Sequence, residues 1–334
     1  MRQFEYTSPK SKQQAVGLLG KSFDETAVLA GGTDLLALMK DDVVHPKRLV
    51  NIKQIAELRG IALQPTVLRI GALATLDELA VHADVRSHFP ILHEAIWEAA
   101  SPQIRNVATI GGNLCQRPRC WYFRNGMGLL AQQNGESLVL KGDNRYHAIL
   151  GNDGAALFVS PSTIVPVLIA HGAKVRIVGP SKAREIALEN LYRAPKTESE
   201  RELDLAPDEI VTEITIPAAD ANTKTGYYEV RQKEAFDWPY ASCAVVLKMS
   251  GANVASARVV LNQVAPTPWI STEAATALVG KPLNEETAMS AASAALSKAK
   301  SLSHNKYKIT LAKVAVKRAI LAAANPKSHT GNQG

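Results

Sequence analysis

Cysteine is scarce in this chain, with three residues in 334. A small and odd number of cysteines argues against a framework of disulfide bonds. It is the usage expected of a protein made in a reducing cytoplasm.

Long apolar runs are also missing. Although 46% of the residues are hydrophobic, no stretch approaches the roughly 18 consecutive apolar residues that a membrane helix needs. Residues 1–6 hold no apolar segment of the signal-peptide type. We therefore expect no membrane association and a cytoplasmic location, or export to the periplasm together with a partner that carries a signal.

Aromatic residues make up only 5% of the chain, whereas the formal net charge is +7. A basic protein suits an acidic partner, and nucleic acid is one such partner. The basic residues are nevertheless dispersed, and few aromatic side chains accompany them to stack on bases. We therefore expect no nucleic-acid binding and favour an acidic protein partner.

Two double-glycine turns are the strongest pattern that the sequence contains. Gly31 and Gly32 follow an apolar run at 27–30 and precede an apolar segment that is typical of a helix start. Gly111 and Gly112 form the second turn. Glycines before a helix expose main-chain N–H groups to an anion, and Thr33 would add a hydroxyl at the capping position. The two turns could hold the two ends of one pyrophosphate.

Strands and helices alternate in the first part of the chain. Runs at 28–30 and 49–52 bracket the helix after the first glycine turn and predict a β-α-β unit. A strand is predicted at 67–72, and Thr75 with Glu78 forms a capping box for the next helix. The helix that starts at Pro90 has an apolar face, which we expect in the core. The residues of this face are Ile91, Leu92, Ala95, Ile96 and Ala99.

From about residue 157 the pattern becomes rich in strands. Residues 218–225 have the composition of a linker. Three strand-like runs follow at 226–231, 241–249 and 254–264, and then two helical runs. The helical runs cover 285–300 and 307–324. This order predicts a separate small α+β module.

The segments 30–36, 71–73 and 109–114, in that order, resemble the FAD-binding subunit of the molybdenum hydroxylases, the family of xanthine dehydrogenase and carbon monoxide dehydrogenase. The resemblance covers residues 3–325. Within the family, residues 116–124 and 146–149 resemble the bacterial aldehyde oxidoreductase branch.

The resemblance implies an α+β fold. A two-subdomain FAD-binding α/β domain of the vanillyl-alcohol-oxidase (PCMH) type would be followed by a small α+β domain of three strands and helices. The implied boundaries are 1–55 for the first subdomain with the pyrophosphate loop, 56–220 for the second with an inserted loop at 114–150, 221–325 for the C-terminal domain, and 326–334 for a tail.

The resemblance also implies the cofactor, FAD, and the residues that contact it. By position these are Leu29, Ala30, Gly31, Gly32, Thr33, Asp34 and Leu35 in the first turn, Thr109, Ile110, Gly111, Gly112 and Asn113 in the second, and Thr163 and Arg231. Thr163 stands where the family often has Asp, and Arg231 where it places a basic residue. An arginine on a strand is alternatively a member of a surface ion pair. No catalytic side chains are expected, because the isoalloxazine ring carries the chemistry.

The partners implied by the family are a molybdopterin-binding large subunit, a small subunit with a 2Fe–2S centre, and an external electron acceptor. Two alternatives remain open. A self-sufficient flavin oxidase usually carries a large substrate-capping domain, for which the segment after the linker is short. A scaffold subunit with a degraded flavin site would explain the departures from the family pattern.

The aldehyde oxidoreductase branch holds a four-iron cluster in its inserted loop. Such a cluster takes four cysteine thiolates, but the loop of this chain offers only Cys115 and Cys120, and Cys243 lies far along the sequence. Adding His147 still leaves a zinc site short of four ligands. We therefore predict no bound metal and a loop packed around the rings of residues 121–123.

Overall fold

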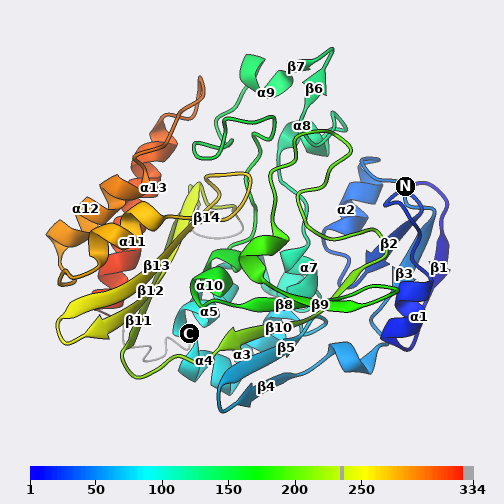
Figure 1. The fold of residues 1–334 in the computed structure, drawn as a ribbon. Coiled ribbons are helices and arrows are strands. Elements are labelled where there is room, and N and C mark those ends of the chain that lie inside the picture. Colours follow the sequence, from blue (N-terminus) through cyan, green and yellow to red (C-terminus); the bar gives the residue numbers. More distant parts are fainter. Residues whose placement is uncertain (234–236, 326–334) are drawn as a thin grey trace.

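The computed structural model describes residues 1–233 and 237–325. Three sheets lie along the molecule, with the N-terminal sheet at one end and the C-terminal sheet at the other (Figure 1). The predicted tail at 326–334 lies outside the described residues. No helix in the described ranges is long and apolar enough to cross a membrane.

The strands group into four sheets among the described residues. The first sheet consists of β1 (Glu5–Thr7), β2 (Thr26–Leu29) and β3 (Arg48–Asn51). The central sheet consists of β4 (Ile61–Gln64), β5 (Val67–Gly71), β8 (Lys174–Val178), β9 (Ala183–Ala187) and β10 (Ile210–Pro217). The C-terminal sheet consists of β11 (Thr223–Val230), β12 (Ala241–Ser250), β13 (Asn253–Asn262) and β14 (Trp269–Ile270). A small hairpin pairs β6 (Gln132–Gln133) with β7 (Glu136–Ser137).

Short helices connect these sheets in the first two-thirds of the chain. They are α1 (Lys12–Gly17), α2 (Leu35–Lys40), η1 (Ala56–Leu58), α3 (Leu76–Val81), α4 (Ala83–His88), α5 (Pro90–Glu98), α6 (Pro102–Arg105), α7 (Ile110–Leu114), α8 (Trp121–Arg124), α9 (Leu138–Lys141), α10 (Val165–Ala170) and η2 (Leu188–Leu191). The helices of the C-terminal domain are α11 (Thr272–Leu278), α12 (Glu285–Ala295) and α13 (Tyr307–Ala324).

The first sheet confirms the predicted β-α-β unit. Strands β2 and β3 are parallel neighbours, and α2 connects them. Because a parallel pair needs a crossover, the chain must turn at the end of β2. Gly31 and Gly32 therefore lie at the carboxyl edge of this sheet.

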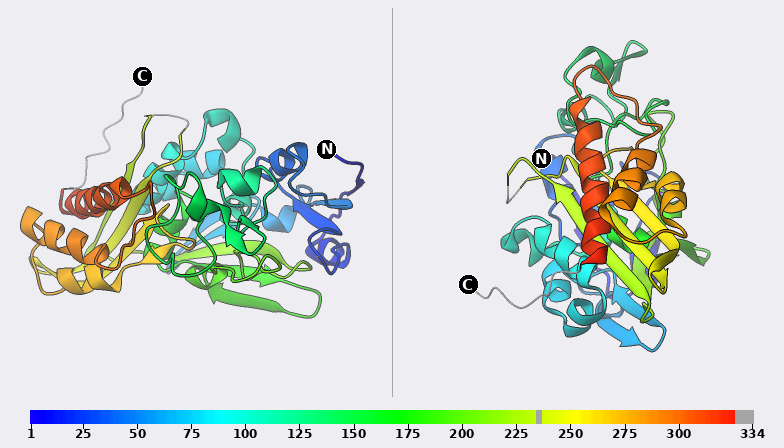
Figure 2. Two further views of the ribbon diagram at one scale, coloured as in Figure 1. Left: turned by 90° about the horizontal axis from the view of Figure 1, so that it is seen from above. Right: turned by 90° about the vertical axis from the view of Figure 1, so that its left-hand side faces the viewer.

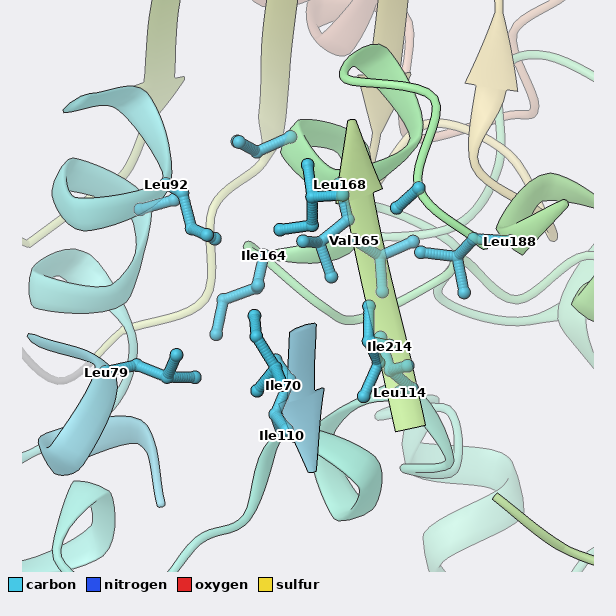
Figure 3. Packing of buried hydrophobic residues seen from close by; sticks show 14 of the residues in the cluster. Ile70, Leu79, Leu92, Ile110, Leu114, Ile164, Val165, Leu168, Leu188 and Ile214 are labelled. Atoms are coloured by element: carbon cyan, nitrogen blue, oxygen red, sulfur yellow. The ribbon is translucent and has the colours of Figure 1, made fainter. Parts of the chain in front are cut away.

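The central sheet has the strand order β4-β5-β10-β8-β9 and is antiparallel throughout. Its core is formed by the sheet and by helices α3, α5 and α10 (Figure 3). The predicted capping box is present, since Thr75 accepts from the N–H of Glu78 and the Glu78 carboxylate accepts from the N–H of Thr75. The apolar face predicted for the helix that starts at Pro90 is buried as expected. Strand β4 was not predicted from the sequence.

The C-terminal domain is a sheet with α11, α12 and α13 on its outer face (Figure 2). The three predicted strands are its long strands, but β14 adds a fourth, whose two residues are too few to show a periodicity. The strand β11 begins at Thr223, inside the predicted linker. Helix α12 ends at Ala295, not at 300, and helix α11 was missed.

Candidate functional site

Two cavities meet at the first glycine turn. The smaller cavity, of about 200 Å³, lies between the turn and Arg117 and Arg201. The larger cavity, of about 500 Å³, extends from the turn toward Thr163 and Trp238. Four residues line both cavities, namely Thr33, Asp34, Gly112 and Gln116. The two glycine turns, far apart in sequence, therefore share one elongated site.

The first glycine turn exposes main-chain donors. The N–H groups from Gly31 to Leu35 have no hydrogen-bond acceptor among the described residues, and the first helical bond runs from the N–H of Leu36 to the carbonyl of Gly32. Gly32 has a φ of +77°, which favours glycine. The N-cap is Asp34, without a side-chain cap hydrogen bond, so the predicted capping role of Thr33 is wrong. The exposed N–H groups suit an anion.

The second glycine turn differs from the first. Thr109 is the N-cap of α7, and its hydroxyl accepts from the N–H of Gly112 at 3.1 Å. The N–H groups of Ile110 and Gly111 bond to main-chain carbonyls of the segment after β5, and the N–H of Asn113 bonds to the carbonyl of Thr109. All four donors are therefore occupied. The expectation that both turns offer free N–H groups holds only for the first.

The two turns touch through Gly31. A Cβ atom added there would lie 2.0 Å from the carbonyl oxygen of Val107, just before the second turn. Gly31 is thus required for close packing of two main-chain segments. A Cβ atom on Gly112 would meet only the Thr109 hydroxyl, at 3.0 Å, outside the backbone of its own helix. Gly112 keeps the wall of both cavities open.

Asp34 joins the first turn to the inserted loop at 114–150. Its carboxylate accepts from the N–H of Arg117 at 2.8 Å and pairs with the guanidinium groups of Arg119 at 2.7 Å and Arg124 at 2.8 Å. The Asp34 side chain is only 15% exposed. Charge-assisted hydrogen bonds of this kind are the stronger class, so the loop is fastened directly to the candidate site.

Two arginines line the smaller cavity. The Arg201 guanidinium lies 4.0 Å from the centre of the Phe23 ring, and burial together with the nearby Arg117 lowers the pKa of Arg201 to about 10. Arg117 pairs with the buried Glu202. Arg201 lies 3.8 Å from the same carboxylate, so the two guanidinium groups share one buried counter-ion, Glu202.

Comparison with known protein families identifies the family of this chain. Residues 2–219 match the FAD-binding domain found in molybdopterin dehydrogenases, and residues 226–323 match the C-terminal domain of the carbon monoxide dehydrogenase flavoprotein. The chain belongs to the FAD-binding medium subunits of the xanthine dehydrogenase and carbon monoxide dehydrogenase family. It is therefore an oxidoreductase subunit, and its cofactor is FAD.

Relatives of this FAD-binding subunit include carbon monoxide dehydrogenase and aldehyde oxidoreductase subunits. The carbon monoxide dehydrogenase medium chain of Hydrogenophaga pseudoflava is 32% identical over 96% of both chains. The aldehyde oxidoreductase FAD-binding subunit PaoB of Escherichia coli is 31% identical over 80% of this chain and 84% of that protein. A solved carbon monoxide dehydrogenase from Hydrogenophaga pseudoflava superposes with a TM-score of 0.76, at 31% identity, over 97% of this chain and 98% of that chain.

The described residues of this subunit fit FAD. The free N–H groups of Gly31–Leu35 are the kind of donor that a pyrophosphate takes, and the missing side chain of Gly112 leaves space beside them. Arg117 and Arg201 add hydrogen-bond donors at the smaller cavity. The residues that would hold the cofactor therefore come from both subdomains.

Most of the residues predicted for the FAD site line the two cavities described above. They are Ala30, Gly31, Gly32, Thr33, Asp34, Leu35, Thr109, Gly112, Asn113 and Thr163. Leu29, Ile110 and Gly111 line neither cavity; Leu29 and Ile110 are buried behind the turns, and Gly111 packs against Ala72. Arg231 also lines neither cavity and instead pairs with Glu229 and Glu98.

Several cavity residues were missed by the sequence prediction. Gln116 and Arg117 could have been found, because they follow the second turn within six residues. Arg201 and Trp238 carry no local signal, because only the folded chain brings them to the cavities.

The inserted loop packs around aromatic rings as predicted. Phe123 is buried in an apolar cluster with Leu129 and Leu130, and Tyr122 packs against a second cluster. The Trp121 ring makes edge contacts with the rings of Tyr146 and His147. The inserted loop is thus held by apolar and aromatic packing.

The donor set of this loop does not fit a four-iron cluster. Cys120 lies 3.2 Å from the Nε2 atom of His147, and Cys115 is the other thiol of the loop. Among the described residues, no group of three or more His, Cys, Asp or Glu side chains could hold a metal ion.

We accordingly expect the purified subunit to contain no iron–sulfur cluster. Iron analysis should give far less than one iron per chain, and reduction should produce no cluster signal in electron paramagnetic resonance. The reason is that the loop contains two cysteine thiols, whereas a four-iron cluster takes four. About four irons per chain would contradict this prediction.

Proposed function

We propose that this chain is the electron-transfer subunit of a molybdenum hydroxylase complex. A molybdopterin-binding large subunit would oxidise the substrate, and a small subunit with a 2Fe–2S centre would deliver the electrons to this chain for transfer to an external acceptor. The substrate would be an aldehyde or a xanthine-type heterocycle; the similarity to PaoB supports an aldehyde. When bound, FAD supplies the redox chemistry.

The observation that carries this proposal is the junction of the two cavities at the first glycine turn. A dinucleotide cofactor has a central pyrophosphate and a ring system at each end. The turn supplies donors for the centre, and the cavities on either side offer room for the ends. The larger cavity, about 500 Å³, suits the three-ring isoalloxazine. The residues of this chain would bind the cofactor, orient it and exclude water.

The proposed partners and compartment have further support. Two of the relatives are medium chains of carbon monoxide dehydrogenases, so we propose that this chain binds its two partners through interfaces above about 1,000 Å². All three cysteines are free thiols, which supports a reducing, cytoplasmic compartment.

Co-expression with the two partner subunits tests this function. We expect a complex with about one FAD per copy of this chain and substrate-dependent reduction of an artificial acceptor. The chain alone, loaded with FAD, should give at least about a thousandfold slower turnover, because it lacks the group that oxidises the substrate. Comparable turnover by the isolated chain would instead identify a self-sufficient flavin oxidase. Full turnover by a complex that contains no FAD would identify a scaffold.

A further inference from the structure

One wall of the larger cavity has an unusual main-chain conformation. Residues 98–101, which comprise the last residue of α5 and the three residues after it, line this cavity. Ala100 has a φ of +53°, in the left-handed region that residues with a Cβ atom rarely adopt. Such a conformation persists only where the surroundings hold it.

Arg105 holds this wall from the same subdomain. Its Nη1 atom donates to the carbonyl oxygens of Trp97 at 3.1 Å, Ala99 at 3.1 Å and Ala100 at 3.2 Å. The Arg105 side chain is buried, and its guanidinium lies 4.9 Å from the centre of the Trp97 ring. One arginine thus binds three main-chain carbonyl groups at and just before Ala100.

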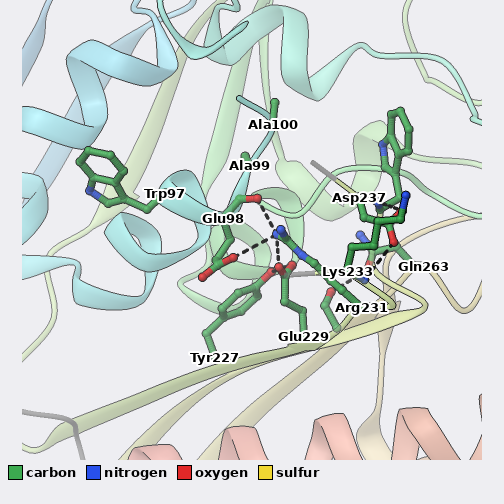
Figure 4. A network of polar contacts seen from close by, with 12 residues as sticks. Trp97, Glu98, Ala99, Ala100, Tyr227, Glu229, Arg231, Lys233, Asp237 and Gln263 are labelled. Atoms are coloured by element: carbon green, nitrogen blue, oxygen red, sulfur yellow. Dashed lines mark hydrogen bonds and ion pairs between the residues drawn. The ribbon is translucent and has the colours of Figure 1, made fainter. Parts of the chain in front are cut away.

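Arg231 holds the same wall from the C-terminal domain. It follows β11 directly, and its Nη2 atom donates to the carbonyl oxygen of Glu98 at 2.5 Å and lies 3.3 Å from the Glu98 carboxylate (Figure 4). The guanidinium also pairs with Glu229, which accepts a hydrogen bond from the Tyr227 hydroxyl at 2.7 Å. The side chains of Arg231 and Glu229 are only 8% and 7% exposed.

We propose that Arg231 is a positioning residue for FAD, which acts through residues 98–101 and not by contact with the cofactor. The proposal rests on the proposed function, in which the larger cavity holds the isoalloxazine ring. Arg231 lines neither cavity, and its Nη2 atom contacts both Glu98 and Glu229 while its Nε atom has no hydrogen-bond partner among the described residues. A lysine at this position would keep the positive charge but would place its ammonium group differently from the Nη2 atom.

The burial of Glu229 makes the Arg231–Glu229 ion pair sensitive to substitution of Arg231. Burial raises the pKa of Glu229 to about 7, although Arg231 and the Tyr227 hydroxyl act in the opposite direction. Without the guanidinium, this buried carboxyl group would take up a proton, because an unpaired charge is unfavourable there. The C-terminal domain would then release the carbonyl of Glu98, and the wall would depend on Arg105 alone.

The test compares Arg231→Gln, Arg231→Lys and Arg105→Gln with the control Arg258→Gln in the full chain. Arg258 is a matched control because it also joins the C-terminal domain to the second subdomain, through Glu189, and lines neither cavity. Hydrogen exchange of the amides at 97–101 is measured without FAD. The dissociation constant for FAD and the visible absorption spectrum of the bound flavin are measured with it.

Arg231→Gln and Arg105→Gln should each accelerate exchange at 97–101 about tenfold, weaken FAD binding about tenfold and shift the flavin absorption bands. Arg231→Lys should fall between Arg231→Gln and the unaltered protein, and Arg258→Gln should change none of the three. If Arg231→Gln does not fold, the same three measurements on Arg231→Lys test the proposal. If Arg231→Gln weakens FAD binding but leaves hydrogen exchange at 97–101 unchanged, the proposal is overturned in favour of direct contact between Arg231 and FAD. If Arg231→Gln, like Arg258→Gln, changes none of the three measurements, the proposal is overturned altogether. Failure of the unaltered complex to transfer electrons would count against the proposed function alone.

Discussion

The Gly112→Val variant is expected to fold normally and to bind FAD at least about a hundredfold more weakly than the unaltered chain, because a branched side chain would fill part of the wall that both cavities share. Outside its own helix backbone, the new Cβ atom would meet only the Thr109 hydroxyl, at 3.0 Å. Valine is also no worse than glycine within a helix. Flavin absorbance after gel filtration and titration with FAD measure the affinity, and thermal unfolding measures the stability.

Two other glycines provide the comparison for Gly112→Val. Gly154→Val should change neither quantity, since nothing lies within 4 Å of a Cβ atom at that position. Gly31→Val should lose FAD together with the fold, since its Cβ atom would lie 2.0 Å from the Val107 carbonyl. A Gly112→Val variant with unchanged affinity for FAD would show that the cofactor does not pass this wall.

The Asp34→Asn variant is expected to lower the free energy of unfolding by about 3 kcal/mol, because it leaves buried arginines without their counter-ion. The carboxylate of Asp34 pairs with both Arg119 and Arg124, and the side chains of Asp34 and Arg124 are each only 15% exposed. The inserted loop at 114–150 should also become more sensitive to protease, since this carboxylate fastens it to the first glycine turn. Denaturant titration and limited proteolysis measure the two effects.

Asp143→Asn is the control for Asp34→Asn. Asp143 pairs with Arg145 in the same loop, but the two side chains are 38% and 55% exposed, and exposed pairs contribute less than about 1 kcal/mol. We expect its unfolding midpoint to stay close to that of the unaltered chain. Equal midpoints for the two variants would mean that the Asp34 pairs contribute no more than surface pairs.

Local chemistry made part of this structure predictable. The capping box of Thr75 and Glu78 is a pattern within four residues, and the helix at Tyr307–Ala324 is long and ends before Pro326. The glycine turn after β2 is recognisable because the strand, turn and helix follow one another directly. Short elements such as β14 and α11 were missed, since two to seven residues carry little periodicity.

The state of the N–H groups in the two turns could not be predicted. Both turns read alike in sequence, but the second is occupied by the Thr109 hydroxyl and by carbonyls next to β5. Whether a donor is free depends on which segment packs beside it, and this is a tertiary property. The same reason hid the environment of Arg231, whose partner Glu98 lies 133 residues away along the chain.

The sequence by itself determined the family of this protein, its FAD cofactor, and the two glycine turns that lie at the candidate site, because these depend on residues close together in the chain. Only the tertiary structure decided that Gly31 must be glycine to let Val107 approach, that Gly112 keeps the cavities open, and that Arg201 reaches the smaller cavity. These features arise where distant segments pack against each other, and contacts across such distances leave no periodic mark in the sequence.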